Sequence, residues 1–371
     1  MKRTTLVLTM FTAAMVMALV MVAMALPVFA GGQDDEEDND NEGANGSATR
    51  NGQIVFRRYF NAEQTKGALF TMNPDGSHIR QITHPPKSLP QDDYAAWSPD
   101  GQKIAFQREP IDFSTSRVMV VNPDTGDTRA VVPCTGERCV YATDPDFSPD
   151  GRSIAYARSF GPPNAREAPE WKLHSAIFIV GLDGSDPHQV TTTPKLHKGQ
   201  LGTETSDPAF SPNGKMLTFV RTLPQKENYP SAVFVQPLGS PEDAHRITPW
   251  KLNCQNNPDF STDGKLLLFR CLPKGEEGPA NLYWIHPDGT GLHALTHAPA
   301  AKQYLGSNFS PSFHKGEGWI TVGRTGGYGK DGNADVFRIL IEDGKVVRSV
   351  NLTKSASWDS APDWGTHPPA G

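Results

Sequence analysis

The segment from Asp146 to Arg158 holds a complete β-hairpin signal, and this signal recurs along the chain. At its centre stands Ser148-Pro149-Asp150-Gly151, in which proline presets φ and glycine tolerates the left-handed position after a type I turn. The residues that follow alternate as in a strand with two unequal faces. Copies of the turn, each preceded by an aromatic residue, lie at 97–101, 210–214 and 260–264, with a degenerate copy at 309–311. The recurrence predicts a fold made of repeated β-sheets.

The spacing of these copies leaves room for four strands in each repeat. Trp97, Phe147, Phe210, Phe260 and Phe309, the aromatic residues before the turns, lie 50, 63, 50 and 49 residues apart. After each hairpin come a third apolar strand, a second turn that usually contains Asp-Gly, and a fourth strand that commonly closes in an aliphatic residue and threonine. A long period with four strands per unit is typical of β-propeller blades.

A sixth copy is divided between the two ends of the chain. Residues 362–365 have the strand before the turn, and residues 52–58 have the strand after it. Joined, they make one further repeat, and pairing of the C-terminal strand with the N-terminal strands would remove exposed sheet edges. The sequence therefore predicts an all-β, six-bladed propeller over residues 50–371, with four antiparallel strands per blade and a ring closed in this way.

These repeats resemble those of TolB-type β-propellers. The resemblance rests on the Phe/Trp-Ser-Pro-Asp-Gly hairpin, the Asn/Asp-Pro-Asp-Gly second turn and the Leu/Ile-Thr close, and it covers roughly residues 52–365. It implies a propeller fold and an interaction module of the cell envelope or the secreted fraction. TolB itself carries an α/β domain ahead of its propeller, whereas an acidic segment precedes Gly52, so the resemblance applies to the propeller domain alone.

Residues 1–30 have the pattern of a signal peptide. Lys2 and Arg3 precede an apolar run from Leu6 to Leu26, and small residues allow cleavage after Ala30. Because the run is long enough to span a bilayer, a membrane anchor over residues 6–28 is the alternative. We therefore expect a periplasmic or secreted protein, which would contact a membrane if this segment stays uncleaved.

Residues 31–49 form an acidic segment, predicted to be a disordered linker. It contains seven acidic residues and no aromatic residue, so it cannot bury enough apolar surface to fold. The whole chain has a formal net charge of −6; without Lys2 and Arg3 it is −8, and without the seven acids as well it is −1. A nearly neutral propeller lacks the basic surface that nucleic-acid binding requires.

The sequence contains none of the common catalytic or cofactor motifs. There is no His-Glu-x-x-His, Gly-x-Ser-x-Gly, Walker loop or dinucleotide-binding fingerprint. His84 and His297 occupy the same repeat position, so the repeat explains them more simply than metal binding. We therefore expect no cofactor and no metal, and a protein that is not an enzyme.

Two sets of residues are candidates for ligand binding. Polar residues near the start of each innermost strand should ring the channel mouth, where they either bind a polar or cationic ligand or cap backbone groups and hold water: Asp93, Asp144, Asp207, Asn257 and Ser307. Aromatic residues outside the repeat pattern either contact a partner or pack over blade edges: Trp171, Tyr229, Trp250, Tyr304, Tyr328 and Trp358.

These candidates support two hypotheses about function. The first is an exported, non-enzymatic propeller that binds a protein or peptide across the face carrying its longer loops, here called the loop face. The alternative is a propeller that binds or cleaves polysaccharide, with loop aromatics on the sugar and a carboxylate such as Asp144 or Asp207 as acid or base.

The four cysteines predict two disulfides in an exported chain. Cys134 and Cys139 bracket a four-residue loop. If Ser261 and Gly264 bound a turn, residues opposed across that hairpin have numbers that add to 525, and so do Cys254 and Cys271. Opposed residues in an antiparallel pair lie within the span of a disulfide, although two buried thiols are the alternative.

Overall fold

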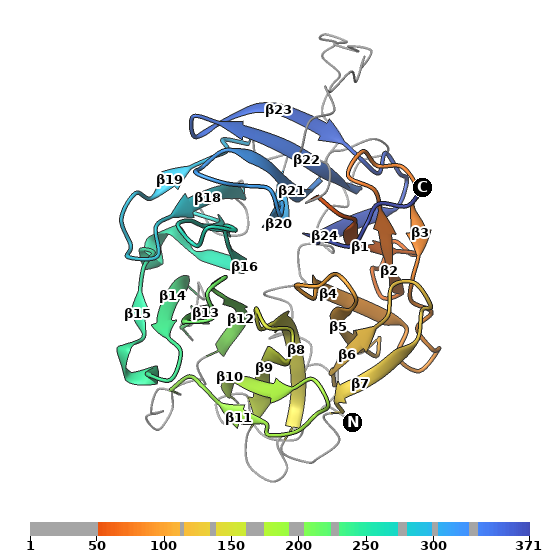
Figure 1. Ribbon diagram of the computed structural model, residues 1–371, viewed down its shortest axis with the longest axis horizontal. Helices are drawn as coiled ribbons and strands as arrows, with labels where there is room; N and C mark the ends of the chain where they lie inside the picture. Colours follow the sequence, from red (N-terminus) through yellow and green to blue (C-terminus); the bar gives the residue numbers. More distant parts are fainter. Residues whose placement is uncertain are drawn as a thin grey trace, which may run out of the picture.

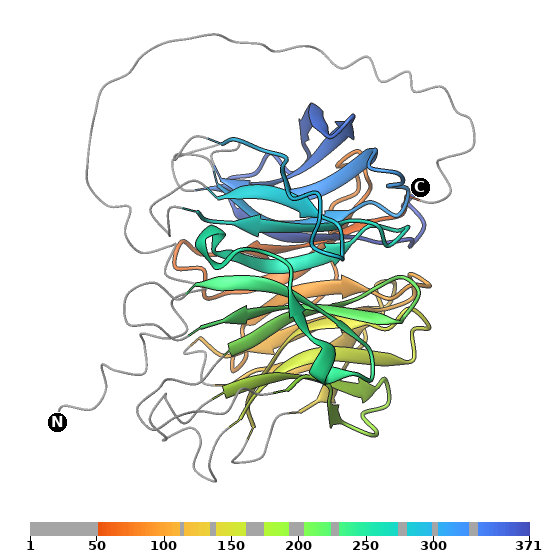
Figure 2. The same ribbon diagram turned by 90° about the vertical axis from the view of Figure 1, so that its left-hand side faces the viewer.

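The computed structural model describes residues 51–111, 115–133, 139–160, 174–192, 204–223, 230–273, 280–298, 303–325 and 333–371. These residues form antiparallel sheets around a common centre (Figure 1). In the view at right angles, the strands run from one face of the molecule to the other (Figure 2). No helix in the described ranges is long and apolar enough to cross a membrane.

Four sheets have four strands each, and in each of them strands consecutive in sequence are neighbours. They are β8 (Cys139–Phe147), β9 (Ser153–Phe160), β10 (His174–Gly181) and β11 (His188–Gln189); β12 (Glu204–Phe210), β13 (Met216–Thr222), β14 (Ser231–Pro237) and β15 (His245–Arg246); β16 (Cys254–Phe260), β17 (Leu267–Cys271), β18 (Asn281–Ile285) and β19 (His293–Ala294); and β20 (Tyr304–Phe309), β21 (Gly318–Thr325), β22 (Ala334–Glu342) and β23 (Lys345–Asn351). Two short 3-10 helices, Pro241–Asp243 and Trp250–Leu252, flank β15.

The remaining sheet consists of two groups of four strands, which a single parallel residue pair, Gly67 with Gln91, connects. One group is β4 (Gln91–Trp97), β5 (Ile104–Glu109), β6 (Arg117–Val121) and β7 (Thr128–Val132); the other is β24 (Trp358–Trp364), β1 (Ile54–Tyr59), β2 (Gly67–Met72) and β3 (Arg80–Gln81). All strands within each group pair antiparallel. The chain is therefore an all-β propeller built from four-stranded antiparallel units.

The recurring turn has the same hydrogen bonds in each complete copy. The Ser148 hydroxyl donates to Asp150 at 2.7 Å and accepts from the Ser153 N–H at 3.0 Å. Gly151 has a φ of +66°, a conformation that favours glycine. Ser98, Ser211 and Ser261 make the equivalent bonds. These side-chain bonds explain why one short motif specifies each hairpin.

The threonine that follows the fourth strand satisfies a backbone group of the third strand. The Thr83 hydroxyl accepts from the Leu69 N–H at 2.9 Å, and Thr191 accepts from Ile177 at the same distance. Four of the fourth strands are short, since β3, β11, β15 and β19 have two residues each. Beside each of these four strands, the threonine extends the sheet edge by one side-chain hydrogen bond.

The last strand, β24, pairs antiparallel with the first strand, β1. Ile54 faces Trp364, and Tyr59 faces Trp358. Trp364 is buried, and its indole N–H donates to the Gly52 carbonyl at 2.9 Å. The two ends of the described chain therefore share one sheet.

The cores lie between neighbouring sheets. One cluster joins Val118 of β6 to Phe147 of β8 and Ile154 of β9, and another joins Val336 of β22 to Phe56 of β1 and Trp364 of β24. Apolar side chains thus pack between the sheets, and the first strand of each four-stranded group lies nearest the centre.

The predicted disulfide between Cys254 and Cys271 is present, with Cα atoms 3.9 Å apart. The register that led to this prediction was wrong near the turn. Phe260 faces Leu267, so residue numbers there add to 527, and a bulge between Gln255 and Asp259 shifts the pairing to 525 at the cysteines. The turn is two residues longer than the prediction assumed, and the bulge places two extra residues in β16. These two shifts cancel, so Cys254 still faces Cys271.

Candidate functional site

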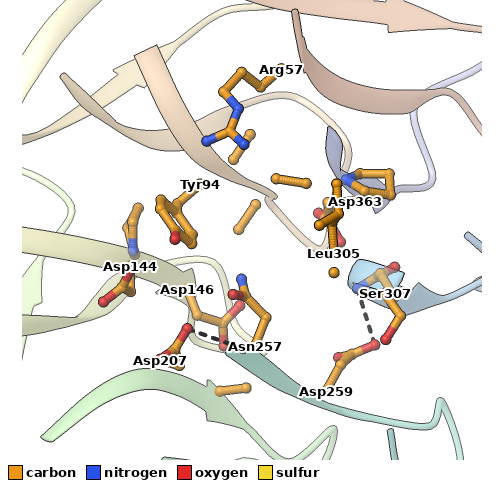
Figure 3. Close-up of a pocket in the computed structure, with 18 of the residues that line it drawn as sticks. Arg57, Tyr94, Asp144, Asp146, Asp207, Asn257, Asp259, Leu305, Ser307 and Asp363 are labelled. Atoms are coloured by element: carbon orange, nitrogen blue, oxygen red, sulfur yellow. Dashed lines mark hydrogen bonds between the residues drawn. The ribbon is translucent and has the colours of Figure 1, made fainter. Parts of the chain in front are cut away.

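A cavity lies at the centre of the ring of sheets (Figure 3). Its volume for water-sized molecules is about 140 Å³, enough for several waters or a small ligand group. Arg57, Tyr59, Gln64 and Trp358 line one end, next to the β1–β2 connection and the start of β24. This end belongs to the face opposite the recurring tight turns, the predicted loop face, so we call it the channel mouth.

Most innermost strands present one residue in the left-handed conformation, three positions before the aromatic residue that ends the strand. We call these residues the channel ring: Tyr94, Asp144, Asp207, Asn257 and Ala361, with φ values of 48°, 53°, 51°, 42° and 49°. Each lies at a β-bulge, where regular pairing with the second strand is interrupted. The bulge breaks the in-and-out alternation of side chains, and all five residues line the cavity.

The channel ring contains three of the five polar residues predicted for the channel mouth, namely Asp144, Asp207 and Asn257. Asp93 lies one residue before its ring position, is fully buried and forms an ion pair with Arg57. Ser307 also lines the cavity, two residues before Phe309. Asp93 was predicted for this position because it is polar, but in the structure the left-handed residue of β4 that lines the cavity is Tyr94.

Hydrogen bonds connect the channel ring from one sheet to the next. The Asp207 N–H donates to the Asp144 carboxylate, and the Asn257 N–H donates to the Asp207 carboxylate at 3.0 Å. The Asp144 N–H in turn donates to the side chain of Gln107 on β5 at 3.2 Å. Asp144, Asp207 and Asn257 are therefore each positioned by a hydrogen bond from or to a neighbouring blade.

A second set of side chains, here the bridging residues, lies directly before the aromatic residues: Asp146, Asp259, Asn308 and Asp363. Each accepts a hydrogen bond from the backbone N–H of the aromatic residue in the next sheet. The distances are 2.6 Å from Trp97 to Asp363 and 2.8 Å from Phe210 to Asp146. Sequence analysis missed these residues, although Pro-Asp recurs before Phe147, Phe260 and Trp364.

Burial raises the pKa of the carboxyl groups around the cavity. It raises the pKa of Asp146 to about 7 and that of Asp363 to about 6. The pKa of Asp144 is well above its usual value, because of burial and then of repulsion from Asp207, and burial also raises the pKa of Asp207. Part of this carboxyl set is therefore protonated near neutral pH.

The cations of the cavity wall come from β1 and β17. Arg57 donates to Asp93 and, at 2.6 Å, to the Ser360 hydroxyl, and its guanidinium lies 4.4 Å from the centre of the Tyr59 ring. Arg270 occupies the equivalent position on β17 and also lines the cavity. Among the residues that the structure describes, no group of three or more His, Cys, Asp or Glu side chains is arranged to hold a metal ion.

The predicted aromatic set is dispersed. Tyr304 lies in β20 and is buried in a core, and Trp250 packs 5.9 Å from Phe234, between ring centres. Trp358 lines the cavity. Trp171, Tyr229, Tyr328 and Cys134 lie outside the described residues, and Cys139 begins β8, but its side chain is not described.

Comparison with known proteins gives weak similarity in sequence. No protein-family model matches the chain. The chain is 27% identical over 174 residues to dipeptidyl-peptidase 5 of Trichophyton tonsurans, which is 44% of this chain and 22% of that protein. It is 30% identical over 134 residues to a probable dipeptidyl-peptidase 5 of Arthroderma benhamiae, which is 33% of this chain and 17% of that protein. The matched segment thus spans about a fifth of these relatives.

Similarity in structure extends over most of the chain. TolB from Acinetobacter baumannii aligns with a TM-score of 0.56 and 18% identity, over 85% of this chain and 67% of that one. A putative TolB from Agrobacterium tumefaciens aligns with a TM-score of 0.51 and 15% identity, over 85% of this chain and 98% of that one. Hydrazine synthase of Kuenenia stuttgartiensis aligns with a TM-score of 0.60 and 10% identity, over 86% of this chain and 48% of that one. The chain is thus similar in fold to the propellers of TolB-type proteins.

Proposed function

We propose that this chain is an exported, non-enzymatic propeller of six blades that binds a protein or peptide partner at the loop face and channel mouth. The blade count and ring closure are supported by the six groups of four strands and by the pairing of β24 with β1. Export is supported by the disulfide between Cys254 and Cys271, since such bonds persist in oxidising compartments.

The observation that carries the proposal is the polar cavity at the channel mouth. Its carboxylates lie on backbone that is held by bonds between blades, a preorganised arrangement that reduces the entropic cost of binding. The curated relatives, at 27% and 30% identity, are named as dipeptidyl-peptidases, which favours a peptide over other ligand classes.

Site-specific photo-crosslinking in the native host tests this proposal. A photoreactive residue in place of Gln64, which lines the cavity, should form adducts with a protein or peptide. The same residue in place of Lys265, in the β16–β17 turn on the opposite face, is the matched control. Equal adducts at both positions, or none at Gln64, would exclude binding at the channel mouth.

Polysaccharide is the second candidate ligand. Tyr94 and Trp358 line the cavity together with Asp144 and Asp207, two carboxyl groups with raised pKa values that could act as acid and base. A glycan panel measured on the purified protein distinguishes the two candidates. Saturable glycan binding, together with no adduct at Gln64, would favour polysaccharide.

A further inference from the structure

Three consecutive blades present an oxygen acceptor at the same position of the channel ring. Asp144 of β8, Asp207 of β12 and Asn257 of β16 have nearly the same left-handed φ and line the same cavity. Figure 3 shows Asp144, Asp207 and Asn257 near one another on one side of the cavity, with Arg57 on another. Repeat symmetry thus brings together two carboxylates and a carboxamide from residues far apart in sequence.

The carboxylates on this side have hydrogen-bond donors but no cationic partner among the described contacts. Asp144 accepts from the Thr143 hydroxyl at 3.0 Å, and Asp207 accepts from the Ser206 hydroxyl at 2.7 Å and from the Asn257 N–H. Arg57, in contrast, is already neutralised by Asp93. A positively charged ligand between these two carboxyl groups would stabilise their ionised forms, which burial otherwise disfavours.

A second observation points to a ligand in the same cavity. Ser307 is 5% exposed and lines the cavity, and no described residue forms a hydrogen bond with its hydroxyl. A nearly buried hydroxyl normally has a protein, water or ligand partner. Tyr94 and Asn257, which are half-buried, line the same cavity. These three groups can supply hydrogen bonds to the atoms beside a bound cation.

We propose that the channel mouth binds a primary ammonium group of a peptide, either its N-terminus or a lysine side chain, between Asp144, Asp207 and Asn257. This deepens the proposed peptide-binding function and rests on it. An ammonium group has three donors around one atom, which match acceptors supplied by three blades. A guanidinium favours a carboxylate with both oxygens free, but both Asp207 oxygens already accept hydrogen bonds.

Calorimetry with three short peptides tests the proposal on the full-length exported protein. Ala-Ala-Ala-amide has a free N-terminus, acetyl-Ala-Lys-Ala-amide has a lysine alone, and acetyl-Ala-Ala-Ala-amide has neither. We expect one or both of the first two to bind and the third not to bind, and the binding peptide identifies the source of the ammonium. Equal binding of all three would overturn the ammonium site but leave peptide binding intact. Binding of none would also overturn it.

A double variant locates the site. Asp144→Asn with Asp207→Asn keeps the side-chain size and one acceptor oxygen at each position but removes the charge, so affinity should fall at least tenfold. Asp150→Asn, in the exposed turn of the same blade, is the matched control, because Asn213 is the natural residue at that position of the next blade. Thermal melting verifies that each variant is folded. Unchanged affinity in the double variant, or a preference for calcium chloride over the amines, would refute the proposal.

Discussion

The carboxylate of Asp146 accepts a hydrogen bond of 2.8 Å from the backbone N–H of Phe210, the residue that ends the innermost strand of the next blade. Asp259, Asn308 and Asp363 make the same contact to the blade that follows them. Ala96 and Ala209 occupy this position in the other two blades, where no side-chain acceptor exists. Asp146, Asp259, Asn308 and Asp363 therefore each form a polar bond between neighbouring blades beside the cavity.

Asp146→Asn should make stability less dependent on pH. The folded-state pKa of about 7 lies above the usual value of about 3.9, so the folded protein binds more protons between these values and loses stability as pH rises through them. Asparagine keeps the acceptor, as Asn308 does naturally, and does not titrate. Urea unfolding at pH 5 and pH 8 should show the variant gaining stability over the parent at the higher pH. Asp150→Asn, whose carboxyl pKa is lowered, should show no such change, and parallel pH profiles for Asp146→Asn and the parent would contradict the prediction.

Trp364→Ala should strongly destabilise the propeller. Trp364 is 4% exposed, packs in the core between β22 and β1, and donates to the Gly52 carbonyl. Large-to-small substitution of a buried tryptophan costs about 3–5 kcal/mol. Thermal melting measures the loss, and Lys354→Ala at an exposed position is the control. A melting temperature within one degree of the parent would argue against ring closure through β24.

Removing the disulfide should lower stability by a smaller amount. The bond between Cys254 and Cys271 joins residues 17 positions apart, and a closed loop of this size contributes about 3 kcal/mol by restricting the unfolded chain. The double variant Cys254→Ala and Cys271→Ala should unfold at lower urea concentration than the oxidised parent. Reductant should shift the parent toward the variant and leave the variant unchanged. Identical midpoints for the oxidised parent and the variant would show that the bond is not formed.

Arg57 and Asp93 should be strongly coupled. Removing one partner of a buried ion pair leaves an uncompensated charge and costs about 3–5 kcal/mol, whereas removing both costs less than the sum. The exposed fractions of the two side chains are 12% and 0%. Urea unfolding of Arg57→Met, Asp93→Asn and the double variant gives the coupling free energy. A coupling near zero would mean that the two side chains act independently.

The sequence was sufficient for the repeating unit, because each turn carries its own chemistry. Ser148, Asp150 and Gly151 contact one another within the turn, so the hairpin forms from neighbours in the chain. The four-strand period and the resemblance to TolB-type propellers follow from the same local signals. The sequence also identified Asp144, Asp207 and Asn257, because polar residues recur shortly before the aromatic residues that end the innermost strands.

Tertiary structure decided which residues share the cavity. No local signal predicts a left-handed Tyr94 or Ala361; their conformation follows from bulges that the neighbouring strands impose. Arg57 forms an ion pair with Asp93 of the neighbouring blade. Asp363, near the C-terminus, accepts a hydrogen bond from the Trp97 N–H. The disulfide depended on both levels, since Cys254 faces Cys271 because of a bulge that turn geometry alone does not predict. Contacts of this kind depend on how blades stack, and stacking is set by side chains distant in sequence, so a local pattern cannot predict them.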